Sequence, residues 1–106
     1  MSGKEAALVQ QLLEKTVAKA IPWEPTAQFD HFGATISNVT FTISRYDESY
    51  VLEMRDSEYR EMLRINSDSA RELRSNLAQM YEAARDSALR VDETIDSVLD
   101  DLRKVS

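Results

Sequence analysis

His31 is the residue of this chain best suited to acid–base chemistry or metal binding, and it directly follows a carboxylate, Asp30. An imidazole next to a carboxylate can serve as a general base or as a zinc ligand. A zinc site needs several such ligands, and the 106 residues include no cysteine and no second histidine. A base also needs a nucleophile or a polarised substrate within reach, yet the serines lie in no G-x-S-x-G elbow and no P-loop. The sequence therefore predicts no enzyme, no metal site and no cofactor.

Three aspartates, Asp92, Asp96 and Asp100, recur at a spacing of four and would form an acidic column along one helix. Over residues 86–101, six carboxylates against the single Arg90 give a net charge of −5. The simplest interpretation is a solvated outer face. The alternatives are a docking strip for a basic protein and a mimic of nucleic-acid phosphates. Calcium fits less well, because a straight helix lacks the wrapped loop that supplies about six oxygens.

The stretch IPWEPTAQFDHFG, residues 21–33, contains both prolines of the chain and its one tryptophan. Trp23 lies between Pro22 and Pro25, which restrict the backbone around it. Such a ring can anchor a partner protein, or it can pack under the connection between two structural elements. We expect the packing role and keep Trp23 as an interface candidate.

Length and composition predict a single domain spanning residues 1–106, with 42% hydrophobic and 30% charged residues. The net charge of −6 argues against direct nucleic-acid binding and favours a partner that is either basic or uncharged. No segment approaches the roughly 20 apolar residues that span a bilayer. Polar residues such as Glu5 and Glu14 interrupt the first twenty positions, which is atypical of a secretory signal, so we expect a cytoplasmic protein.

Hydrophobic periodicity predicts an α+β fold: an N-terminal helix, an antiparallel meander of three to four strands and a long C-terminal helix. Apolar residues at spacings of three and four indicate the first helix over residues 4–20, and Pro22 favours its end. Residues 21–28 form a joint, and period-two alternation indicates strands within residues 29–65. Ser69 and Glu72 fit a capping box that begins an uninterrupted helix over residues 69–105.

That last helix would be about 55 Å long, whereas a compact chain of this size is about 34 Å across. Its outer part should therefore project, and it carries five aliphatic residues, here called the apolar stripe: Val91, Ile95, Val98, Leu99 and Leu102. Exposed aliphatic side chains indicate a covering surface. That surface is the same helix of a second copy in a coiled-coil-like pair, the N-terminal helix of the same chain, or a different protein.

Three segments follow the short leading helix in order: WEPT (23–26), ISRYDESYVLEM (43–54) and LAQMYEAARDSALRVDETIDSVLDDL (77–102). This succession resembles a loose group of small bacterial α+β proteins and modules of uncharacterised function. Some of these stand alone, and others are joined to signalling or defence proteins. The resemblance covers roughly residues 6–102 and supplies no catalytic residues. It implies a recruiting or assembling role.

The sequence thus favours a non-catalytic, homodimeric, acidic adaptor or accessory module that associates through its C-terminal helix. Val91, Ile95, Val98 and Leu102 would anchor the interface, and the acidic column would set the charge preference. The alternative is an acidic inhibitor, such as an immunity or phage-type counter-defence protein, that blocks a basic site on its target.

Overall fold

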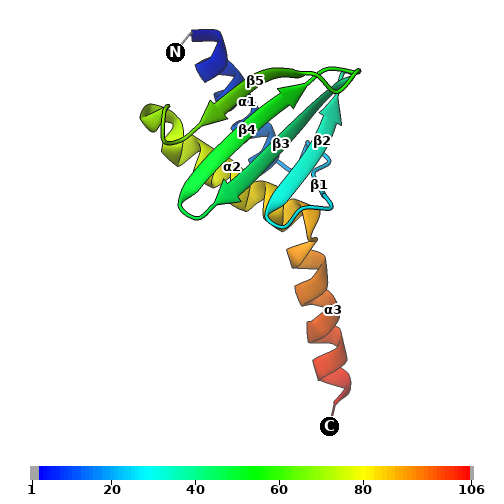
Figure 1. The fold of residues 1–106 in the computed structure, drawn as a ribbon. Coiled ribbons are helices and arrows are strands. Elements are labelled where there is room, and N and C mark those ends of the chain that lie inside the picture. Colours follow the sequence, from blue (N-terminus) through cyan, green and yellow to red (C-terminus); the bar gives the residue numbers. More distant parts are fainter. Residues whose placement is uncertain (1–2, 106) are drawn as a thin grey trace.

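Five antiparallel strands form one sheet in the order β1-β2-β3-β4-β5, so each strand pairs with its neighbour in the sequence (Figure 1). The computed structural model describes residues 3–105. The strands are β1 (Glu24–Pro25), β2 (His31–Ile36), β3 (Val39–Tyr46), β4 (Ser49–Arg55) and β5 (Glu61–Asn66).

The turn between β2 and β3 consists of two residues, Ser37 and Asn38, with positive φ angles of 52° and 64°. Two consecutive residues in the left-handed region are typical of the tight hairpin turns that match strand twist. This turn fixes the register in which Ile36 pairs with Val39.

Alternation along the strands buries one face of the sheet. In β3, Phe41 and Ile43 are buried, whereas Thr40 and Thr42 are half-buried on the opposite face. The register continues the buried row across the sheet, because Ile43 pairs with Leu52 and Leu52 pairs with Ile65. Period-two patterning therefore correctly identified the strands.

Two helices, α1 (Gly3–Val17) and α2 (Arg74–Ala88), pack against each other and cover this buried face (Figure 1). Together with Trp23 and Ile21 from the joint, they close a single core. The helical side chains buried in this core are Val9, Leu12, Leu13, Leu77, Met80, Tyr81 and Ala84. The α+β fold predicted from the sequence is confirmed, with one strand more than the expected three to four.

The additional strand, β1, lies inside the predicted joint and pairs with β2. The first helix also ends earlier than predicted, at Val17 instead of residue 20. Lys19 adopts a left-handed φ of 62°, its N–H donates to the carbonyl of Thr16 at 3.0 Å, and the N–H of Ala20 donates to that of Lys15 at 2.9 Å. This Schellman-type cap ends the helix before Pro22 acts.

The prediction of one continuous helix over residues 69–105 is wrong. A short 3-10 turn, η1 (Arg71–Leu73), precedes α2, and a break after α2 separates it from a third helix, α3 (Val91–Lys104). At that break Arg90 adopts a left-handed φ of 52°, and its N–H donates to the carbonyl of Ser87 at 3.2 Å. A left-handed residue at this position ends α2 in the way a glycine commonly does.

The predicted capping box of Ser69 and Glu72 is also absent, because neither η1 nor α2 has a side-chain cap. Asn66 shapes the turn instead. Its Oδ1 accepts the N–H of Asp68 at 2.8 Å, and its carbonyl accepts the N–H of Ala70 at 2.8 Å. Asparagine side chains stabilise such turns by replacing a backbone acceptor.

A partly buried polar cluster joins α2 to the sheet. The hydroxyl of Tyr81 on α2 donates to Oδ1 of Asp30 at 2.8 Å, and Nη2 of Arg45 donates to Oδ2 of the same carboxylate at 3.4 Å. The Arg45 guanidinium also lies 5.1 Å from the centre of the Tyr81 ring. Burial, and next the hydrogen bond to Asp30, raises the pKa of Tyr81 to about 12.

This pKa predicts a loss of stability at high pH. An unfolded tyrosine ionises near pH 10, whereas folded Tyr81 holds its proton to about 12, so its contribution is full below pH 10 and is lost between pH 10 and 12. The free energy of unfolding of the wild type should fall over that range by on the order of 1–2 kcal/mol more than that of Tyr81→Phe. Urea titrations followed by the fluorescence of Trp23 measure it. Tyr59→Phe, at an exposed site, is the control and should behave as wild type. Equal pH dependence in wild type and Tyr81→Phe would contradict the prediction.

Candidate interaction site on helix α3

Helix α3 projects away from the rest of the chain (Figure 1). We call residues 3–88 the body. The described chain measures 58 × 29 × 24 Å, and α3 accounts for much of its long dimension. No residue of α3 is buried. The structure therefore separates a packed body from an arm that lacks a core of its own.

The apolar stripe lies on this arm. Ile95, Val98 and Leu102 expose 51%, 49% and 60% of their surface, and Leu99 exposes 44%. Val91, at the base of the arm, is half-buried. At about 100° per residue these five positions fall on one helix face. The N-terminal helix does not cover this face, because the apolar side of α1 packs within the body.

One ion pair joins the arm to the body among the described residues. Nζ of Lys19, just beyond α1, lies 3.0 Å from Oδ2 of Asp92 in the first turn of α3. The hydrogen bond that Lys19 donates to Asp92, and then the charge of that carboxylate, raises the pKa of Lys19. Both side chains are more than two thirds exposed, so the contact restrains α3 only weakly. An open cleft of about 420 Å³ lies beside this ion pair and is lined in part by Val17 and Arg90.

The acidic column also lies on the surface of α3. Asp92, Asp96 and Asp100 are all exposed, as the solvated-face interpretation requires. Two of the three have cationic partners within the chain: Asp92 contacts Lys19, and Oδ1 of Asp100 accepts from Nη1 of Arg103 at 3.2 Å. The column therefore presents less unpaired negative charge than its composition indicates.

Trp23 is not available to a partner, so its place among the interface candidates is wrong. Only 3% of its surface is exposed. Its indole N–H donates to Oγ1 of Thr16 at 2.9 Å, and the Thr16 hydroxyl donates to the carbonyl of Leu12 at 2.6 Å. The ring closes the core under the helix-to-sheet connection, which is the role we expected for it.

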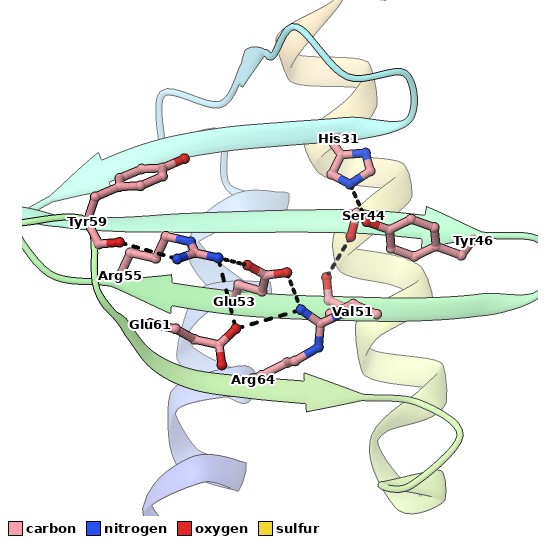
Figure 2. A network of polar contacts seen from close by, with 9 residues as sticks. All are labelled: His31, Ser44, Tyr46, Val51, Glu53, Arg55, Tyr59, Glu61 and Arg64. Carbon is pink, nitrogen blue, oxygen red and sulfur yellow. Dashed lines mark hydrogen bonds and ion pairs between the residues drawn. The ribbon is translucent and has the colours of Figure 1, made fainter.

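His31 lies on the face of the sheet opposite the helices, beside Tyr46 (Figure 2). Its Nδ1 donates to the carbonyl of Phe29 at 2.8 Å, and its Nε2 accepts from the Tyr46 hydroxyl at 2.5 Å. Both ring nitrogens are engaged in this tautomer. The nearby Ser44 is buried and donates to the carbonyl of Val51 at 3.4 Å, so the geometry does not form a nucleophile–base pair.

Further along this face lies a charge network (Figure 2). Glu53 accepts from Arg55 at 3.0 Å and from Arg64 at 2.6 Å, and Glu61 lies 3.7 Å from Arg64. Two carboxylates and two guanidinium groups balance one another. Within residues 3–105, no group of three or more His, Cys, Asp or Glu side chains is placed to hold a metal ion.

Sequence reasoning missed two exposed apolar residues near the base of α3. Phe29 is 89% exposed and Leu89 is 42% exposed, and both line a second cleft of about 380 Å³. Leu89 directly follows α2, and its exposure became evident only when the structure showed the break at Arg90. Phe29 stands at the start of the range 29–65 in which strands were predicted, but it lies in the turn before β2, where no periodicity indicates which side chains turn outward.

Comparison with protein-family models, with curated proteins and with solved structures finds no match to this chain. The resemblance to small bacterial α+β modules therefore stays a prediction. In the described range 3–105, no helix combines the length and the apolar character needed to cross a membrane.

The break at Arg90 predicts an order of stability. In a left-handed conformation glycine is favoured over alanine by about 1 kcal/mol, whereas in a continuous helix alanine is favoured by a similar amount. Arg90→Gly should therefore unfold at a higher urea concentration than Arg90→Ala. The free energies of unfolding of the two variants should differ by about 1 kcal/mol. The reverse order would show that α2 and α3 are continuous in solution.

Proposed function

We propose that this chain is a non-catalytic protein-binding module that pairs with a second copy of itself through α3. The observation that carries the proposal is an amphipathic arm with no buried residue, set apart from a body whose own core is closed. An enzyme is not supported, because the ring nitrogens of His31 bond to Phe29 and Tyr46, and the nearby Ser44 hydroxyl donates to Val51 instead of to His31.

Covering the apolar stripe supplies the driving force. The side chains of Ile95, Val98, Leu99 and Leu102 are each about half exposed, so pairing gains roughly 1 kcal/mol from each. This gain in binding free energy is doubled in a symmetric pair, because both copies bury the same residues. It is opposed by the loss of translational and rotational freedom on association, which costs at least about 4 kcal/mol. A 14-residue helix provides a small interface. The net gain is then about 4 kcal/mol at most, so we expect a weak, reversible dimer with a dissociation constant on the order of millimolar.

The pair leaves the acidic column outside the apolar contact. Because Asp96 and Asp100 lie on the polar side of α3, a dimer would present two such strips to a basic partner protein. This is the arrangement expected of an acidic adaptor or accessory protein: self-association uses the apolar side of the arm, and recruitment uses its charged side.

Val98→Asp should abolish the dimer, because it places a charge at the centre of the apolar stripe. The dissociation constant should rise at least about 100-fold, equivalent to about 3 kcal/mol. Sedimentation equilibrium or light scattering over a concentration series measures it. Ser97→Asp adds the same charge to the polar side of the adjacent turn and should remain dimeric. A wild type that stays monomeric at millimolar concentration would refute the proposal.

A second function, an acidic inhibitor of a basic site, is favoured by the exposure of all three aspartates of the column. An oligo-arginine peptide provides a probe. If this function holds, Asp92→Asn, Asp96→Asn and Asp100→Asn combined should reduce peptide binding at least about tenfold. Binding to the wild type should weaken steeply between 50 and 300 mM salt. The triple variant should still dimerise. Unchanged peptide binding in that variant would exclude the column as an inhibitory surface.

A further inference from the structure

We infer that the second copy binds α3 in an antiparallel orientation, with the first turn of each helix beside the last turn of the other. The inference rests on the proposed pairing through α3 and specifies its geometry. Its basis is the distribution of charge along the arm: Asp92 and Glu93 lie in the first turn, and Arg103 and Lys104 lie in the last. The two ends of one helix are therefore opposite in charge.

The charged residues that flank the apolar stripe also favour the antiparallel orientation. Asp92 and Arg103 are eleven residues apart, which is about three helical turns, so both border the stripe on the same side. In an antiparallel pair related by a two-fold axis, this side of one helix faces the same side of the other. Asp92 of each copy then meets Arg103 of the partner subunit. The contact forms twice.

The apolar stripe is itself self-complementary in this orientation. Placing Val91 opposite Leu102 also places Ile95 opposite Val98, because both pairs are centred between Asp96 and Ser97. One register thus fills four layers with aliphatic side chains. The helix dipoles are opposed in this arrangement, which is favourable for neighbouring helices. A parallel pair would instead place the two acidic first turns side by side.

The charged groups are free to rearrange on binding. Lys19 and Asp92 are 70% and 78% exposed as side chains, and Arg103 and Asp100 are 74% and 67% exposed. Ion pairs this exposed contribute little and exchange readily. The antiparallel orientation also leaves the two bodies at opposite ends of the paired helices, so their surfaces need not fit one another.

Disulfide trapping tests the orientation directly, because the chain contains no cysteine. Thr94 and Asp101 lie seven residues apart on the other flank of the apolar stripe. Cysteines at these two positions leave every side chain of the stripe in place. In an oxidised equal mixture of Thr94→Cys and Asp101→Cys, intact mass should show chiefly the mixed 94–101 disulfide. Each variant alone should cross-link poorly.

The outcomes separate this inference from the proposed pairing. A parallel pair would place the flank with Thr94 and Asp101 beside the opposite flank of the other helix, so it would form no 94–101 disulfide. A dimer that forms no such disulfide but is lost in Val98→Asp would overturn the orientation while the pairing through α3 stands. A dimer that forms no 94–101 disulfide and is unaffected by Val98→Asp pairs through another surface, which overturns both. A wild type that is monomeric at every concentration also overturns both.

Charge reversal gives an independent readout. Arg103→Glu places like charges together at both symmetric contacts and should raise the dissociation constant about tenfold at low salt, with the effect reduced at 0.5 M salt. Lys104→Glu makes the same change in net charge on the side of α3 that faces away from the apolar stripe. It should raise the dissociation constant less than about threefold. Equal effects of the two variants would show that Arg103 meets no carboxylate across the interface.

Discussion

The packing of α2 across the sheet is the constraint on which the other features depend. The side chains of Leu77, Met80, Tyr81 and Ala84 are completely buried and use the entire apolar face of that helix. After Ala88 the chain has passed the edge of the sheet, and no body surface is left to continue the contact. A sequence that keeps its helical pattern beyond this point must either fold back or project. Arg90 ends α2, and α3 then projects without covering the body.

Two polar contacts make the body a firm base for this arm. The Trp23 indole bonds to Thr16 at the end of α1, and the Tyr81 hydroxyl bonds to Asp30 before β2. The first contact is buried and the second is partly buried, and an unpaired polar group at either place would be costly. They tie each helix to the loops that enter the sheet. In contrast, the ion pair of Lys19 with Asp92 is open to solvent and leaves α3 free to adjust.

Hydrophobic periodicity predicted most of the fold, because the strands and the helices of the body each bury one side. Apolar residues therefore recur about every two residues in the strands and about every 3.6 residues in the helices. The limits came from residues whose role depends on backbone conformation. Lys19 and Arg90 end helices in the left-handed region, where glycine would be the recognisable signal, and neither is glycine. The two-residue strand β1 is too short to show alternation. Val98 and its neighbours were nevertheless placed correctly on an exposed arm, since the length of the helical segment exceeds the body whether or not it bends.

The break at Arg90 also bears on how pairing and folding are linked. A helix of 14 residues is close to the shortest that is stable alone in water, and α3 receives almost no support from the body. Its helical structure and its pairing should therefore strengthen each other: part of the free energy gained by covering the apolar stripe is spent on ordering the arm. The left-handed residue separates this process from the body, because α3 can form, fray or turn without disturbing Tyr81 or the sheet. In the proposed dimer, the arm would associate reversibly while the body that carries it remains folded.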